Sequence, residues 1–169
     1  MDAFALSLLK AERQIRRLFT HLVYQFLCFG PSDVAHLRET LANNRKVYFR
    51  GVVRGFDVLY PRSVKTLVGA EYDRLSGRLD DTINHRNKIF HGQLTSSYLS
   101  REDLLGYVTD IRLWCRTLAE SSLIEFSYDG FARNSFQKST LTELYKRFNV
   151  QLNSVESYPD FIHQYMQRR

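Results

Sequence analysis

Residues 2–29 read DAFALSLLKAERQIRRLFTHLVYQFLCF, and this stretch gives the strongest helix signal in the chain. Apolar residues recur at alternating steps of three and four, which places them along one face of a helix. These residues are Phe4, Leu8, Ala11, Ile15, Leu18, Leu22 and Phe26. Lysine and arginine occupy the other faces. Gly30-Pro31 predicts the end of the helix, because glycine favours the position after a helix and proline cannot continue one.

Weaker forms of the same pattern predict helices along most of the remaining chain. They cover residues 33–42, 63–91, 100–122, 139–149 and 157–167. Ser63 and Ser100 stand where an N-cap is expected, Gly77 is a possible bend, and Gly92 stands just past a helix end. Residues 124–128 are expected to form a short extended piece, followed by a turn at Asp129-Gly130.

Residues 45–60 fit either a helix or a β-hairpin. Their apolar residues match a helical period, but they are also rich in β-branched and aromatic residues, which favour strands. Gly51 and Gly55 each cost roughly 1 kcal/mol in a helix relative to alanine. We favour the helix. Two glycines four residues apart would then allow another backbone to approach this helix closely.

The composition favours a single helical unit. Of the 169 residues, 44% are hydrophobic and 14% aromatic, enough to bury a core. Only three prolines and eight glycines are present, too few for the turns of a many-stranded β fold. We therefore predict an all-α, up-and-down helical bundle over residues 1–122. Residues 123–169 are predicted to be a C-terminal extension packed on it.

The charge and the cysteines narrow the class of protein. The formal net charge is +6 and comes mainly from arginine, whose planar fork suits phosphate oxygens. An anionic partner such as RNA is therefore expected. Cys28 and Cys115 are too few for a disulfide framework or a cysteine zinc site. The sequence has no secretion signal at its start and no uncharged run of membrane-spanning length, so we expect a cytoplasmic protein without membrane contact. It has no zinc-ligand spacing and no glycine-rich phosphate loop, so we expect no metal and no cofactor.

Residues 84–93 read NHRNKIFHGQ and concentrate the side chains that carry chemistry. Arg86, Asn87 and His91 suit cleavage of an RNA phosphodiester by its own 2′-hydroxyl. A histidine near neutral pKa can move the proton, an arginine fork can stabilise charge on the phosphate, and an asparagine can orient either group. Arg86 and His91 are five residues apart, about 140° around a regular helix, but Gly92 places His91 at a helix end.

The spacing alone is weak evidence, because Arg16 and His21 repeat it. That copy lies in the middle of a helix, has no following asparagine and lacks the terminal glycine. We interpret it as structural, with a solvated arginine face and a partly buried histidine.

The larger pattern, Arg-Asn-x3-His-Gly at a helix end followed by a polar loop and a long amphipathic helix, resembles the HEPN superfamily of helical RNases and related domains. The resemblance covers roughly residues 1–122. It implies that Arg86 and His91 are the catalytic pair, that Asn87 supports them, and that two protomers join their motifs into one cleft. It also implies a metal-independent endoribonuclease of toxin, defence or RNA-processing type, with an antitoxin or regulatory protein as a further partner. The HEPN toxins that are paired with small nucleotidyltransferases typically carry a tyrosine two residues after the histidine; this chain has Gln93 there and so departs from that subgroup.

Neighbouring residues are secondary candidates for RNA binding: His85, Lys88, Gln93 and Tyr98. Two other interpretations remain open. In one, the chain is a non-catalytic helical module that binds RNA or a protein partner. In the other, the motif is structural: Asn87 and His91 cap a helix end and Arg86 makes a surface ion pair.

Overall fold

The protein is helical throughout the part described by the computed structural model, which covers residues 2–90, 99–133 and 135–167. The helices are α1 (Asp2–Tyr24), η1 (Pro31–Asp33), α2 (Val34–Ala42), α3 (Phe49–Leu59), α4 (Val64–Val68), η2 (Gly69–Glu71), α5 (Tyr72–Phe90), α6 (Arg101–Phe126), η3 (Leu144–Arg147), α7 (Ser157–Phe161) and η4 (Ile162–Met166). These residues contain no β-strand. The predicted all-α fold is confirmed. Within the described ranges, every helix is too short or too polar to cross a lipid bilayer.

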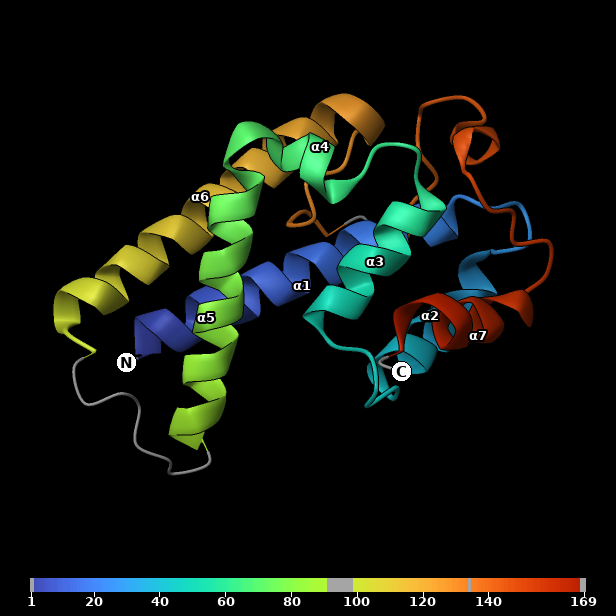
Figure 1. The fold of residues 1–169 in the computed structure, drawn as a ribbon. Helices are drawn as coiled ribbons and strands as arrows, with labels where there is room; N and C mark the ends of the chain where they lie inside the picture. Colours follow the sequence, from blue (N-terminus) through green and yellow to red (C-terminus); the bar gives the residue numbers. More distant parts are fainter. Residues whose placement is uncertain (1, 91–98, 134, 168–169) are drawn as a thin grey trace.

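Helix α1 lies across the middle of the molecule, with α5, α6 and α3 packed against it (Figure 1). Its predicted apolar face forms the core: Leu8, Ile15 and Leu22 have no exposed surface. The helix ends at Tyr24, earlier than the predicted residue 29. Beyond it the amides of Gln25 and Phe26 donate to carbonyls only three residues back, which tightens the chain into turns. Phe26 and Phe29 still pack into the core, so the apolar spacing continues past the end of the helix.

The predicted helix over residues 63–91 is divided in two. Ser63 caps α4 as predicted, because its Oγ accepts a hydrogen bond from the Thr66 amide at 3.1 Å. The chain breaks at Gly69, whose φ of +79° lies in the left-handed region that favours glycine. Helix α5 then continues through Gly77. The apolar stripe concealed this break, since buried residues continue on both sides of Gly69.

Helix α6 begins at the predicted cap. The Asp103 amide donates to Ser100 Oγ at 3.0 Å, and the Ser100 amide donates to the Asp103 carboxylate at 2.9 Å. The helix continues to Phe126, so the extended piece predicted at residues 124–128 is wrong. Ser122 and Phe126 are both fully buried and four residues apart, which keeps this last turn on the core-facing side of the helix.

Residues 45–60 contain helix α3, and the helical alternative is confirmed. Its two glycines lie against η4. A Cβ on Gly51 would clash with the backbone carbonyl of Met166, and a Cβ on Gly55 would lie 2.6 Å from Met166 Cγ. The close backbone approach expected at these glycines is therefore present, and the partner is the C-terminal segment.

Residues 127–167 share the core of the preceding helices. Phe148, Tyr158 and Met166 are buried in the same cluster as α1 and α3. Gln14 of α1 donates through Nε2 to the backbone carbonyl of Asp129 at 3.2 Å. The helix predicted at 139–149 is reduced to the short η3, while the one predicted at 157–167 is present as α7 followed by a π-helical turn, η4.

Candidate functional site

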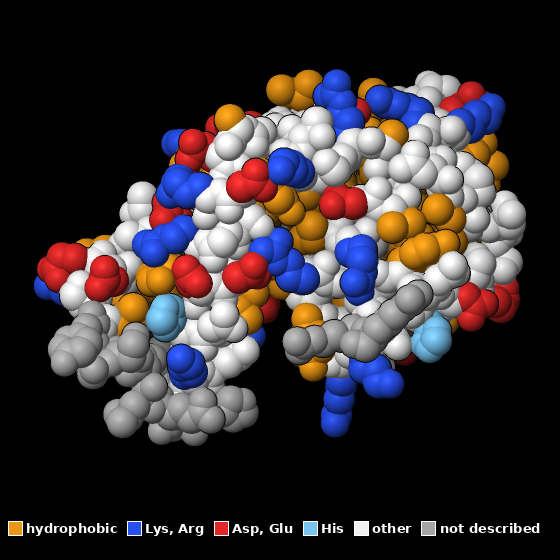
Figure 2. Space-filling view, viewed as in Figure 1, with side chains coloured by type: hydrophobic (Ala, Val, Ile, Leu, Met, Phe, Trp, Pro, Cys, Tyr) orange, Lys and Arg blue, Asp and Glu red, His pale blue; other side chains and the backbone are white. Residues whose placement is uncertain are grey.

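The motif lies at the C-terminal end of α5, away from the middle of the molecule (Figure 1). Arg86 and Asn87 fall within the last five residues of this helix as it is described. His91, Gln93 and Tyr98 lie outside the described residues. Figure 2 shows acidic and basic side chains intermixed over the face that carries α5 and α6.

Arg86 is held against α1. Its side chain is 25% exposed, and Nη1 lies 3.7 Å from a carboxylate oxygen of Glu12. This separation is close to the limit for an ion pair, which limits how strongly the pair is coupled. Nε of Arg86 is buried and has no hydrogen-bond partner among the described residues. A partly exposed guanidinium that makes no hydrogen bond among the described residues can donate to a phosphate oxygen.

Asn87 and Lys88 extend into solvent. Both are exposed, and neither side chain forms a hydrogen bond or ion pair within the described ranges. Consecutive residues point about 100° apart on a helix, so Asn87 faces away from the Glu12 contact of Arg86. Neither side chain forms a hydrogen bond with Arg86 among the described residues, so the supporting role expected of Asn87 stays a prediction.

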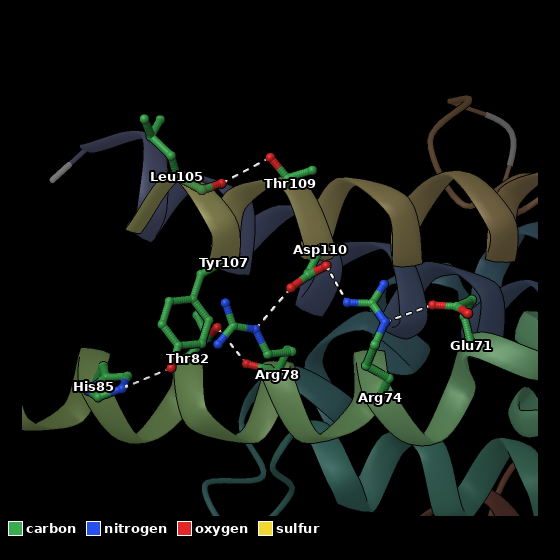
Figure 3. Close-up of polar contacts among 9 residues, drawn as sticks. All are labelled: Glu71, Arg74, Arg78, Thr82, His85, Leu105, Tyr107, Thr109 and Asp110. Atoms are coloured by element: carbon green, nitrogen blue, oxygen red, sulfur yellow. Dashed lines mark hydrogen bonds and ion pairs between the residues drawn. The ribbon is translucent and has the colours of Figure 1, made fainter. Parts of the chain in front are cut away.

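His85 turns towards α6 instead. Its Nε2 lies 3.3 Å from the hydroxyl of Tyr107, and the two rings meet edge to face with centroids 5.5 Å apart (Figure 3). Its Nδ1 is buried and unpaired among the described residues. The structure therefore gives His85 a contact between helices, and its predicted role in RNA binding stays a prediction.

A polar network between α5 and α6 fixes the helix that carries Arg86. The guanidinium of Arg78 lies 3.7 Å from the centre of the Tyr107 ring and donates to Asp110 at 2.9 Å, while Arg74 donates to the same carboxylate at 2.6 Å (Figure 3). Burial opposes ionisation of Asp110, but these two hydrogen bonds lower its pKa below the ordinary value. The network sets the position of α5 along α6, and with it the position of Arg86.

Glu12 and Tyr107 could not have been recognised from the sequence as neighbours of the motif. Glu12 belongs to α1 and Tyr107 to α6, both far from Arg86 in the sequence. The stripe of apolar residues predicts which face of each helix is buried, but it does not predict which helices meet. No group of three or more histidine, cysteine or acidic side chains in the described residues is arranged to hold a metal ion.

The second Arg-x4-His copy has a structural environment. Arg16 donates through Nη2 to the carbonyl of Val47 at 2.9 Å. His21 is only 4% exposed and stacks on Tyr128 with ring centroids 4.5 Å apart. Burial lowers the pKa of His21 to about 4. The histidine is thus more deeply buried than the sequence suggested, and it is neutral at physiological pH.

The low pKa of His21 predicts acid sensitivity. The unfolded chain binds a proton near the ordinary histidine pKa of 6.5, whereas the folded chain does so only near 4. Stability therefore falls as pH drops through this window, by about 2 kcal/mol between pH 7 and pH 5. Urea unfolding at both pH values should show this loss in the parent and a smaller one in His21→Phe, which keeps the ring but cannot titrate. His36→Gln, which removes an exposed histidine, should retain the parent's slope; equal slopes in all three proteins would contradict the assignment.

Comparison of the chain with protein-family models, with curated proteins and with solved structures finds no match.

Proposed function

We propose that the protein is a metal-independent endoribonuclease of HEPN type, working as a homodimer in a toxin, defence or RNA-processing role. One observation carries the proposal. Arg86, half-buried and with unused guanidinium donors, lies near the end of α5, just before the segment that contains His91 and Gly92. The all-helical fold around it is the setting that the sequence resemblance implies.

The proposed reaction needs only groups of the chain and of the RNA. The 2′-oxygen of a ribose attacks the adjacent phosphorus while a base removes its proton, and the bond from phosphorus to the 5′-oxygen breaks. The leaving 5′-oxygen takes a proton. In this scheme His91 moves the proton, and Arg86 stabilises the charge that develops on the phosphate oxygens. The exposed amide of Asn87 contacts a further phosphate oxygen. The products are a 2′,3′-cyclic phosphate and a 5′-hydroxyl.

Glu12 has a definite part in this proposal. It occupies one side of the Arg86 guanidinium, so a phosphate that binds Arg86 must share or displace the carboxylate. An ion pair at 3.7 Å between partly exposed side chains is weak enough to be exchanged for a charge-assisted contact with phosphate.

Removal of this competitor gives a prediction. Glu12→Gln is expected to tighten RNA binding by up to about fivefold, the equivalent of about 1 kcal/mol for a surface ion pair. Fluorescence anisotropy with a labelled single-stranded RNA would measure the change. Glu120→Gln is the matched control, because it removes the same charge from an exposed position on α6 and should change affinity less. Weaker binding by Glu12→Gln would mean that Glu12 positions Arg86.

A homodimer would complete the site. One α5 end presents a single Arg86, and a two-fold pairing of these ends would bring two copies of the motif around one phosphate. Light scattering at working concentration tests this step. A mixture of one protein lacking Arg86 and one lacking His91 should regain some activity if the site is shared between protomers.

The second candidate is a non-catalytic helical module that binds RNA or a protein partner. The exposed side chains of Asn87 and Lys88 beside Arg86 favour it, because they can contact phosphate oxygens without any chemical step. The two candidates differ in product. In the first, labelled RNA incubated with the purified protein in excess chelator is cut, and each 5′ fragment ends in a cyclic phosphate. In the second, RNA is retained by the protein and stays intact. Cleavage abolished by chelator, or ends carrying a simple 3′-hydroxyl, would contradict the proposed chemistry.

A further inference from the structure

A pocket remote in sequence from the motif collects five arginines. Its volume is about 600 Å³, and it is formed by α1, α2 and the segment around residue 133. The described residues that line it are Arg13, Arg16, Arg17, Thr20, Arg38, Leu41, Ala42, Arg133, Ser135 and Phe136. None of these is acidic. The volume is typical of a small-molecule site.

Among the described residues, no acidic side chain forms an ion pair with the arginines of this pocket. Six arginines elsewhere in the described residues have an acidic partner (Arg50, Arg62, Arg74, Arg78, Arg86 and Arg147), whereas Arg45, Arg54, Arg101, Arg112 and Arg116 have none there and lie outside this pocket. The five pocket arginines have none among the described residues. Five like charges in one cavity repel one another, and an anion would relieve that repulsion.

Two of these arginines are fixed in place by neutral groups. Arg16 donates to the carbonyl of Val47, and Arg17 donates to the carbonyls of Phe131 and Ala132. These carbonyls hold the guanidinium groups without cancelling their charge. Burial lowers the pKa of Arg16 below its ordinary value, and the nearby carboxylate of Glu12 offsets only part of that effect. Such preorganised donors are the usual means of recognising phosphate.

The other residues that line the pocket indicate what kind of ligand it can hold besides phosphate groups. Phe136 is half-buried and lies 5.8 Å from the Arg38 guanidinium, so that an aromatic ring and a cation border the same space. Leu41 and Ala42 add apolar surface. A track for a nucleic-acid strand would spread its cations and aromatic rings along a groove. Here the cations converge from three segments on one cavity, which favours a compact ligand.

We propose that this pocket binds a small polyanion that carries at least two linked phosphate groups, such as inorganic triphosphate or a nucleoside triphosphate. A single phosphate would leave most of the five guanidinium groups unpaired, whereas a chain of phosphates can engage several. The proposal does not depend on the ribonuclease activity of the Arg86 motif.

Isothermal titration calorimetry with inorganic triphosphate, with ATP and with AMP tests the proposal in metal-free buffer. Triphosphate and ATP should bind saturably, and AMP at least about tenfold more weakly, because it offers one phosphate group. Equal affinity for triphosphate and ATP would show that the phosphates alone are recognised. Tighter binding of ATP would add the base as a recognised group. Absence of saturable triphosphate binding would overturn the proposal.

Substitutions in the pocket should weaken triphosphate binding, and the same substitutions elsewhere should not. Arg13→Gln/Arg38→Gln removes two exposed arginines that make no hydrogen bond within the described chain, so folding should be preserved. Its triphosphate affinity should fall at least about tenfold. Arg112→Gln/Arg116→Gln removes the same charge from exposed positions on α6 and should bind as the parent does. Arg133→Gln, from the segment that follows α6, gives an independent second variant. Equal weakening in the pocket and control variants would overturn the proposal, as would a short single-stranded RNA that binds the pocket and is not displaced by triphosphate.

Discussion

Replacement of His91 by alanine is expected to slow RNA cleavage by about 10²–10⁴-fold, the usual contribution of a general acid or base. Arg86→Ala should slow it by about 10²–10³-fold, because a developing phosphate charge would lose its fixed donors. Single-turnover cleavage of a labelled RNA in excess chelator measures both losses. The expected pattern is a fall in the rate of the chemical step for His91→Ala, with RNA affinity near that of the parent.

Two controls keep this result interpretable. Arg86→Lys retains the charge but loses the planar fork, so it should be nearly as slow as Arg86→Ala if bidentate contact with phosphate matters. His36→Ala removes an exposed histidine of α2 and should cleave at the parent's rate. Circular dichroism at the assay temperature verifies folding. Unchanged cleavage in both His91→Ala and Arg86→Ala would exclude the proposed site, and parallel losses of stability without any RNA phenotype would support the structural interpretation of the motif.

The sequence predicted local structure best where one short-range interaction decides it. The Ser100 cap needs only its own hydroxyl and the amide of Asp103, and it is present. The structure differs from the prediction at the ends of α1 and α6. Helix α1 ends before the last buried residue of its segment, whereas α6 continues beyond the predicted end. Phe26 is buried although it lies beyond the end of α1. Phe126 is buried within the last turn of α6. The spacing of apolar residues therefore predicts which residues are buried, but it does not predict the residue at which a helix ends, because that residue depends on tertiary packing.

In the candidate site, too, the sequence predicts the features that one segment decides and does not predict those that depend on tertiary packing. The position of Arg86 and Asn87 near a helix end follows from the order of residues in one segment. The contact with Glu12 and the turn of His85 towards Tyr107 depend on how three helices pack. The arginine pocket could not be predicted from the sequence. Arg13, Arg16 and Arg17 are visible as a basic face of α1, but Arg38 and Arg133 join them only through tertiary structure.

Gly51→Ala is expected to destabilise the protein by about 1–3 kcal/mol, the usual cost of overpacking, even though alanine is the better helix former. In an exposed helix the substitution gains roughly 1 kcal/mol. At Gly51 the new Cβ would clash with the backbone carbonyl of Met166, and a backbone atom cannot rotate away as a side chain can. Overpacking of this kind outweighs the gain in helix propensity. Urea unfolding at pH 7 gives the change in free energy.

Gly77→Ala is the matched comparison and should have the opposite sign. Gly77 lies inside α5, and a Cβ there would meet no heavy atom within 4 Å, so alanine should stabilise the protein by about 0.5–1 kcal/mol. The source of the Gly51 penalty can be isolated by ending the chain after Tyr165, which removes the carbonyl of Met166. In that shortened background Gly51→Ala should lose most of its cost. If Gly51→Ala were as stable as the parent in the full chain, α3 and the C-terminal segment would not be in contact through their backbones, and the shared core of residues 127–167 would have to be revised.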